Sequence, residues 1–232
     1  MSPSVSVLLV DDHELLAETL RVALSSEGVP CELVTPTSLR DVLRGVERQR
    51  PRLTLLDLDL GPRVGDGTAL VGPIRALGGD VLVVTGATDP GAAAAAVEAG
   101  AIGYVPKSAP FDQLLVVVRR ALAGEQVLSD CDRFELLARL RVRRAERRMS
   151  RAPFERLSPR EQEVLRELAD GRGVEAISAR AVVSQATVRT QVRAILTKLG
   201  VSTQLAAVAR ARQAGWLDDP GGEQRPVRPG AA

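Results

Sequence analysis

Five short apolar runs, each followed by a helix-like stretch, constrain the fold more than any other feature of this sequence. The runs show no alternation of apolar and polar residues, which is typical of strands buried on both faces. Strands that alternate with helices along a chain form a parallel sheet with the helices as crossovers. We therefore expect residues 1–124 to form an α/β domain with a five-stranded, parallel, doubly wound sheet. The expected strands are Val5–Val10, Cys31–Val34, Leu53–Leu56, Val81–Val84 and Ile102–Val105, and the expected helices lie near 13–27, 37–49, 67–77, 90–99 and 111–123.

A different pattern begins at about residue 125. Residues 131–148 combine spaced apolar side chains with seven arginines, so we interpret 125–154 as a basic helical linker. The favoured interpretation is that these arginines are solvated. Direct contact with DNA phosphates is the alternative.

Residues 155–217 have a wholly helical pattern. Ser158, Pro159 and Glu161 form a strong helix start, and Gly171 ends that helix. A short helix near 174–181, a tight turn and a longer helix from Ser184 to about 199 follow. This succession predicts an all-α helix-turn-helix domain. The Pro/Gly/Ala-rich residues 218–232 are expected to form a disordered tail.

The net charge of +2 on the 232-residue chain conceals an asymmetry. Residues 1–124 carry 11 basic and 15 acidic side chains, and residues 125–232 carry 20 and 14. The second half therefore suits an anionic partner such as nucleic acid. No apolar run approaches the ~20 residues of a membrane-spanning helix, and no signal peptide is evident. We expect a cytoplasmic protein that does not bind membranes.

The sequence has too few cysteine and histidine residues for a metal–thiolate site or a Cys/His nucleophile pair. His13 is the only histidine, and Cys31 and Cys131 lie far apart. These residues fit neither a zinc site nor a nucleophile pair.

Charged and hydroxyl side chains stand where the expected strands end. Asp11 and Asp12 follow the first strand, Asp57 follows the third, Thr85 ends the fourth and Lys107 follows the fifth. Such ends meet where an open sheet reverses its strand order. Three converging carboxylates need a cation, and oxygen ligands suit Mg²⁺. Lysine and threonine opposite the metal would hold phosphoryl oxygens, with Asp57 as the nucleophile. Helix capping by single aspartates is the alternative, and it does not explain all five residues.

The motifs in this region resemble a CheY-type receiver domain over residues 5–123. The matching strings are Val-Leu-Leu-Val-Asp-Asp-His at the first strand, Leu-Leu-Asp-Leu-Asp-Leu at the third, Val-Val-Thr-Gly at the fourth and Gly-Tyr-Val-Pro-Lys at the fifth. The resemblance implies that Asp57 accepts phosphate from a sensor histidine kinase. It also implies that Asp12 ligates Mg²⁺ directly, Asp11 through water and Asp59 through its backbone carbonyl, and that Lys107 pairs with the phosphoryl group.

The same resemblance makes Thr85 and Tyr104 a switch couple. Two departures bear on it. Ser108 stands where many receivers have proline, and Pro62 lies one position later than usual, so loop contacts and phosphate lifetime are expected to differ.

The string Asp57-Leu-Asp59 also fits the nucleophile motif of haloacid-dehalogenase-like phosphatases, which is the enzymatic alternative. Those enzymes open with this motif on their first core strand and carry cap insertions. Here an acidic pair comes first and no cap insertion is visible. We therefore predict a protein that is not an enzyme.

The C-terminal region resembles the LuxR/FixJ/NarL effector domain over about residues 155–215. The resemblance rests on Leu-Ser-Pro-Arg-Glu at the start of the domain, on Thr-Val-Arg in the third helix, and on Ile-Leu-Thr-Lys-Leu-Gly-Val, which ends that helix. By analogy, Arg189, Thr190 and Arg193 face the DNA major groove or its phosphates, Lys198 is a further DNA contact, and 202–214 carries dimer contacts.

The second helix of this domain departs from the family pattern. Val174-Glu175 stands where Asn-Lys is common, Ala181 replaces a frequent leucine and Gln191 a frequent histidine. Weaker affinity or an unusual sequence preference is expected. A receiver that acts independently of phosphorylation, or through protein partners, is the alternative function.

Together these features predict a response regulator of a two-component system, in the NarL/FixJ family. Phosphorylation of Asp57 is expected to switch the receiver, favour a homodimer and promote binding to double-stranded promoter DNA. RNA polymerase is a further candidate partner.

Overall fold

The computed structural model describes residues 6–86 and 90–218 and divides the chain into two compact units, Met1–Arg141 and Val142–Ala232. Each unit is described by itself. The tail expected at 218–232 lies outside the described residues, apart from Asp218. No helix in the described ranges combines the length and apolar character needed to cross a membrane.

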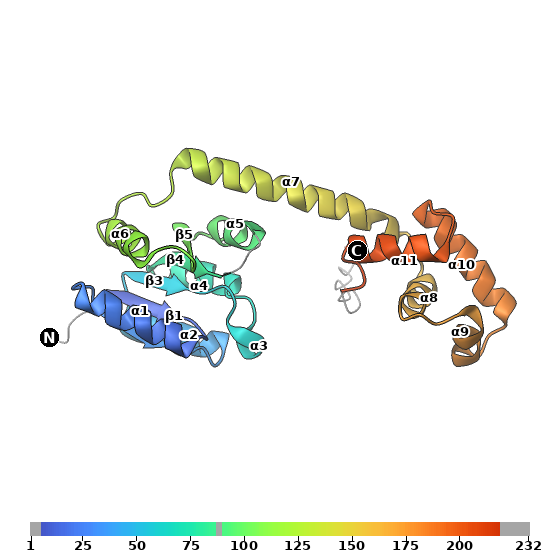
Figure 1. The fold of residues 1–232 in the computed structure, drawn as a ribbon, viewed down its shortest axis with the longest axis horizontal. Coiled ribbons are helices and arrows are strands. Elements are labelled where there is room, and N and C mark those ends of the chain that lie inside the picture. Colours follow the sequence, from blue (N-terminus) through green and yellow to red (C-terminus); the bar gives the residue numbers. More distant parts are fainter. Residues whose placement is uncertain (1–5, 87–89, 219–232) are drawn as a thin grey trace, which may run out of the picture. The chain divides into compact units, whose positions relative to one another are not determined.

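The first unit contains the predicted parallel sheet (Figure 1). Its strand order is β2-β1-β3-β4-β5, so the order reverses between β1 and β3, which pair with each other in parallel. The α/β, doubly wound class is therefore confirmed. The strands are β1 (Val7–Val10), β2 (Cys31–Val34), β3 (Leu53–Leu56), β4 (Asp80–Thr85) and β5 (Gly103–Pro106), and the helices are α1 (Glu14–Ser26), α2 (Leu39–Gln49), α3 (Gly61–Val64), α4 (Thr68–Ala76), α5 (Pro90–Glu98) and α6 (Phe111–Leu122).

Helices cover both faces of the sheet. Alternate residues of β1 belong to different clusters: Val7 and Leu9 pack with residues of α1 and α6, and Leu8 and Val10 pack with residues of α2, α4 and α5. All four are at most 2% exposed. This two-sided burial explains why the strands read as uninterrupted apolar runs.

One short helix in this unit was not predicted. The segment Gly61–Val64 forms α3, where the sequence indicated only a loop. Gly61 has φ +73°, a left-handed conformation that glycine adopts without strain, and Pro62 occupies the first turn of the helix.

The second unit is wholly helical. Helix α7 (Asp130–Glu155) crosses the division between the units, which falls inside the segment 125–154 that we interpreted as a linker. It is followed by α8 (Pro159–Ala169), α9 (Val174–Ala181), α10 (Gln185–Leu199) and α11 (Gln204–Gln213). The capping box predicted at Ser158 and Glu161 is present, and Ser184 caps α10.

The end of α7 belongs to the core of this unit. Phe154 is fully buried and stacks on Trp216 with the ring centroids 5.3 Å apart, and Arg166 lies 4.6 Å from the centroid of Trp216. Arg151 donates hydrogen bonds to the carbonyl oxygens of Ala214 and Gly215. These contacts attach the last turn of α7 to the segment that follows α11.

Candidate functional site

The sheet brings together a cluster of charged residues at its carboxyl edge. Asp11 follows β1, Asp57 follows β3 and Lys107 follows β5. The ammonium Nζ of Lys107 lies 2.6 Å from Oδ2 of Asp11 and 2.7 Å from Oδ2 of Asp57. The site therefore forms at the reversal of strand order, where open α/β sheets bind ligands.

Burial and charge compete at this cluster. Asp57 is 3% exposed, and burial raises its pKa above the ordinary value, although the hydrogen bond from Lys107 opposes this shift. Burial lowers the pKa of Lys107, but its hydrogen bonds to Asp11 and Asp57 outweigh this effect and raise the pKa. The lysine is therefore charged at neutral pH and can partly neutralise two buried carboxylates.

Asp12 supplies the remaining carboxylate. Its Oδ1 is buried and lies 2.8 Å from Nδ1 of His13, yet it accepts no hydrogen bond from the described residues. Ligand atoms of Asp11, Asp12, His13 and Asp57 lie within 4.8 Å of one another. An unsatisfied buried oxygen among three carboxylates fits a divalent cation with oxygen ligands.

Two glycines shape this pocket, and the sequence analysis did not assign them a role. A Cβ atom at Gly61 would lie 2.7 Å from Oδ2 of Asp12, and one at Gly67 would collide with the backbone carbonyl oxygen of Asp57. The backbone N–H of Asp59 donates to Oδ1 of Asp57 over 3.3 Å. The glycine-rich loop after β3 was the available signal, but the identity of the atoms that approach it required the structure.

The predicted switch residues lie in different environments. Thr85 is buried, and its carbonyl oxygen accepts a hydrogen bond from the backbone N–H of Lys107 over 2.9 Å. Tyr104 is 37% exposed. The structure thus shows an inward threonine and a tyrosine at the surface.

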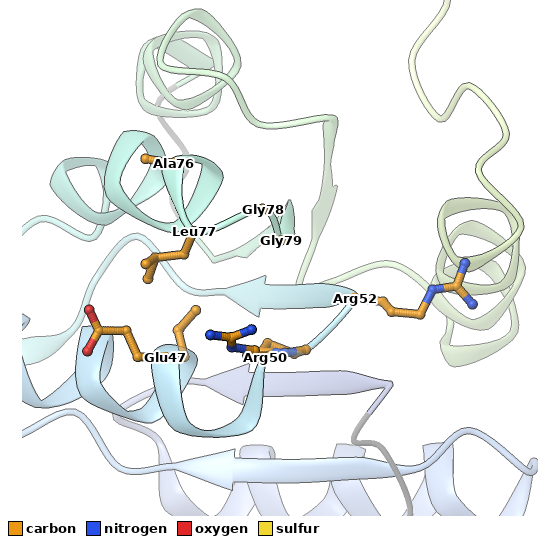
Figure 2. A pocket seen from close by; sticks show the side chains of 9 residues that line it. Glu47, Arg50, Arg52, Ala76, Leu77, Gly78 and Gly79 are labelled. Carbon is orange, nitrogen blue, oxygen red and sulfur yellow. The ribbon is translucent and has the colours of Figure 1, made fainter.

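A cavity of about 670 Å³ lies at the opposite edge of the sheet (Figure 2). Pro51 and Arg52 precede β3 and Gly79 precedes β4, whereas Asp57 follows β3. The side chain of Arg52 points away from Glu47 and donates to the carbonyl oxygen of Leu122. None of the residues of the charged cluster lines this cavity.

In the second unit, α10 divides into a buried and an exposed face. Val188 and Val192 are buried, while Arg189, Thr190 and Arg193 are all exposed. Arg189 and Arg193 are four residues apart and therefore share one side of the helix. The structure brings these three predicted DNA contacts together on one surface.

Lys198 lies elsewhere. Its Nζ is 2.9 and 2.6 Å from the two carboxylate oxygens of Glu161, whose side chain also accepts a hydrogen bond from the backbone N–H of Ser158. Burial raises the pKa of Glu161, but the hydrogen bonds from Lys198 and Ser158 outweigh it and hold the pKa below its ordinary value. This placement favours a role for Lys198 within the fold, joining α8 to α10, over a contact with DNA.

Comparisons with known proteins match two protein families to this chain, one in each of the two units described above. Residues 7–119 match the response regulator receiver domain, and residues 155–211 match the luxR family of bacterial regulatory proteins. A nitrate/nitrite response regulator protein homolog from Haemophilus influenzae is 32% identical over 215 residues, which cover 89% of this chain and 96% of that protein. The chain belongs to the NarL/FixJ family of response regulators. Its two domains are those of transcriptional regulators in two-component systems.

Further relatives of this NarL/FixJ regulator span the same length. A probable transcriptional regulatory protein NarL from Mycobacterium tuberculosis is 31% identical, over 92% of this chain and 96% of that protein. The crystal structure of the response regulator ChrA from a heme-sensing two-component system aligns at 30% identity with a TM-score of 0.45, over 90% of this chain and 97% of that one.

Proposed function

We propose that Asp57 is the phosphoacceptor of this response regulator and receives a phosphoryl group from a sensor histidine kinase. A carboxylate oxygen of Asp57 attacks the phosphorus atom, and the bond between phosphorus and the kinase histidine nitrogen breaks. The observation that carries this proposal is the placement of Lys107 within 2.7 Å of both Asp57 and Asp11. A lysine in this position can pair with the phosphoryl oxygens and balance the charge that the pocket gains.

The proposed cofactor is Mg²⁺, which would be held directly by the carboxylates of Asp12 and Asp57 and by the backbone carbonyl of Asp59, and through water by Asp11. The unsatisfied Oδ1 of Asp12 supports this assignment. Bound Mg²⁺ would supply positive charge to the phosphoryl oxygens during transfer. Asp59 also orients Asp57, because its backbone N–H donates to Oδ1 of Asp57.

We further propose that Thr85 and Tyr104 transmit the phosphorylation. Thr85 is buried beside Lys107 and Tyr104 is partly exposed, and in the proposed switch Tyr104 moves inward when Thr85 turns toward a phosphoryl oxygen. The resulting change in the surface around α5 and α6 would favour a homodimer. The proposed limits are a receiver at 1–124, a linker at 125–154 and a DNA-binding domain at 155–217.

The proposed output is binding to double-stranded promoter DNA in the cytoplasm, with RNA polymerase as a further partner. Helix α10, the second and longer helix of the helix-turn-helix, has an exposed polar face formed by Arg189, Thr190 and Arg193. Arginine can pair with phosphates or with base edges in the major groove. Helix α9, the first helix of the helix-turn-helix, is less suited to contact a phosphate backbone. It carries the acidic Glu175 in its first turn, and Gly173 at its N-terminus offers no side-chain cap.

Phosphorylation by acetyl phosphate with Mg²⁺ tests the assignment of the pocket. We expect the full chain to become phosphorylated and Asp57→Asn to remain unmodified. Asp59→Asn should retain modification, because Asp59 would offer the metal only its backbone carbonyl and asparagine can still accept the hydrogen bond from the backbone N–H of Gly61. Modification of Asp57→Asn would contradict the proposal. Multiple-turnover hydrolysis of a phosphate monoester would instead support the phosphatase alternative.

A gel-shift titration across salt concentrations tests the DNA-binding face. The Arg189→Ala/Arg193→Ala variant should lose affinity and show a shallower salt dependence, because it makes fewer phosphate contacts. Arg156→Ala is the control, because it removes an exposed arginine outside the helix-turn-helix. Unchanged binding by the double variant would contradict the assignment.

A further inference from the structure

His13 brings a nitrogen atom to the edge of the carboxylate cluster. It directly follows Asp11 and Asp12 and stands at the N-cap of α1, yet among the described residues its side chain makes no capping hydrogen bond. Its backbone N–H donates to Oδ1 of Asp11 over 2.9 Å, which holds the residue against the cluster. Ligand atoms of His13, of both aspartates and of Asp57 lie within 4.8 Å of one another. The imidazole is therefore placed to act at this site as a fourth side chain.

The contact between His13 and Asp12 is close but is not a hydrogen bond. Nδ1 of His13 lies 2.8 Å from Oδ1 of Asp12, and that buried oxygen still has no hydrogen-bond partner in the part of the chain that the structure describes. The same nitrogen lies 3.3 Å from Oδ1 of Asp11, which is long for a hydrogen bond. Neighbouring ligand atoms of one octahedral ion, at bond lengths of about 2.1 Å, lie about 3.0 Å apart. Both separations therefore suit three atoms that share one ion.

Lys107 contacts other oxygens of the cluster. Its Nζ lies beside Oδ2 of Asp11 and Oδ2 of Asp57, whereas His13 faces Oδ1 of Asp11. An ion bound beside His13 would therefore not have to displace the ammonium. The His13 side chain is 62% exposed, so an ion can reach the imidazole from solvent.

A ring nitrogen changes which ions such a pocket prefers. Mg²⁺ binds oxygen ligands, whereas imidazole is a good ligand for Fe, Ni, Cu and Zn ions. We propose that His13 is a direct ligand in the pocket assigned above to Mg²⁺, and that this pocket binds divalent first-row transition metal ions in preference to Mg²⁺. The inference rests on the proposed function in that both place a cation among these carboxylates.

A paramagnetic ion tests the ligand directly, because His13 is the only histidine. The full chain would be loaded with one equivalent of Cu²⁺, and the electron spin echo would be examined for modulation by the remote nitrogen of a coordinated imidazole. Each protein carries Cys131→Ser, because that exposed thiol would compete for Cu²⁺, whereas burial raises the pKa of the Cys31 thiol to about 12 and keeps it protonated. We expect the modulation in the chain that retains His13 and its loss in His13→Gln. Its absence from the chain that retains His13 would overturn the proposal.

Calorimetric titration with Co²⁺ and with Mg²⁺ tests the preference in the same Cys131→Ser background. His13→Gln should lower the ratio of Co²⁺ affinity to Mg²⁺ affinity at least tenfold, because even groups outside the ligand shell commonly contribute about that much. Glu14→Gln is the matched control, since this neighbouring carboxylate is exposed and lies outside the cluster, and it should leave the ratio unchanged. An unchanged ratio in His13→Gln would contradict the assignment of His13.

Competition between the ions distinguishes the pocket from a lone surface histidine. Excess Mg²⁺ should displace Co²⁺, and Asp12→Asn should weaken the binding of both ions, because the two ions share the carboxylates. Co²⁺ that binds through His13 but is not displaced by Mg²⁺ would overturn the proposal. Labelling of Asp57 by acetyl phosphate with Mg²⁺ is measured separately, so failure of these metal tests beside intact labelling would refute the role of His13 and leave the phosphoacceptor assignment standing.

Discussion

Replacing Lys198 with methionine should destabilise the DNA-binding domain and leave its affinity for DNA unchanged. Methionine preserves most of the aliphatic stem but removes the ammonium that contacts both carboxylate oxygens of Glu161. The Glu161 carboxylate is 7% exposed and would remain charged with one partner fewer. The variant therefore separates a structural role of Lys198 from a role in DNA binding.

The magnitude follows from the burial of the two partners. A hydrogen bond to a charged group contributes about 1.5–3 kcal/mol, and loss of one partner exposes the desolvation cost of the other. The Lys198 side chain is 37% exposed, so water screens part of the interaction. We expect a loss of about 2 kcal/mol, which corresponds to a decrease of roughly 8–16 °C in the Tm of a domain of this size.

Urea denaturation of the full chain, followed by Trp216 fluorescence, measures this loss. Trp216 is the only tryptophan and stacks on the buried Phe154, so its emission reports on the core of the second unit. Arg160→Met is the matched control, because the ion pair of Arg160 with Glu163 is exposed and should contribute less than about 1 kcal/mol. Unchanged stability of Lys198→Met together with weaker, less salt-dependent DNA binding would refute the structural role.

The same pair predicts a pH dependence. Because the pKa of Glu161 is lower in the folded chain than in the unfolded chain, its contribution is complete above the unfolded value, which is about 4.3. This contribution is lost as the pH falls through the folded value. The difference in unfolding free energy between the wild-type chain and Lys198→Met should therefore be largest near pH 7 and diminish below about pH 4. A difference that stays constant down to pH 3 would contradict this mechanism.

Three further substitutions follow from local geometry. Gly67→Ala should destabilise the receiver by about 1–3 kcal/mol and slow phosphorylation by acetyl phosphate, because the new Cβ displaces the carbonyl of Asp57; thermal unfolding and a phosphorylation time course measure this, and wild-type values for both would contradict it. Ala181→Leu should stabilise the second unit by about 1 kcal/mol in urea denaturation, because Ala181 and Ile177 line a cavity of about 200 Å³ that leucine can fill; a lower midpoint would show that the cavity walls cannot accommodate it. Val182→Asn should also raise the urea midpoint, by about 1 kcal/mol, because Val182 has φ +54° and asparagine tolerates this left-handed conformation better than a β-branched residue; an unchanged midpoint would indicate that Val182 is not strained.

The sheet and its charged pocket could be predicted from the sequence because their determinants are local. Each strand is an apolar run that ends at a recognisable residue, and parallel strands place those ends together without further information. Asp11, Asp57 and Lys107 were therefore grouped correctly from three distant segments. The one-turn helix α3 was missed because four residues carry too little periodicity to distinguish a helix from a loop.

The environment of Lys198 could not be predicted in the same way. From the sequence, Glu161 is predicted to cap a helix. Lys198, 37 residues later on another helix of the DNA-binding domain, is predicted to contact DNA. Only the packing of α8 against α10 brings the two charges together. Likewise, the interpretation of 125–154 as a helical linker reached the end of α7, but it did not predict that Phe154, near this end, enters the core of the second unit.

The burial of Phe154 has a practical consequence for building chimeric regulators. A fusion made at residue 155, where the match to the luxR family begins, would discard the ring that stacks on Trp216 and the guanidinium that binds Ala214 and Gly215. A transplanted DNA-binding domain should therefore retain its own last turns of α7, from before Arg151 onward. The exchangeable module of this regulator is larger than its sequence family suggests, and the safe splice site lies within a helix.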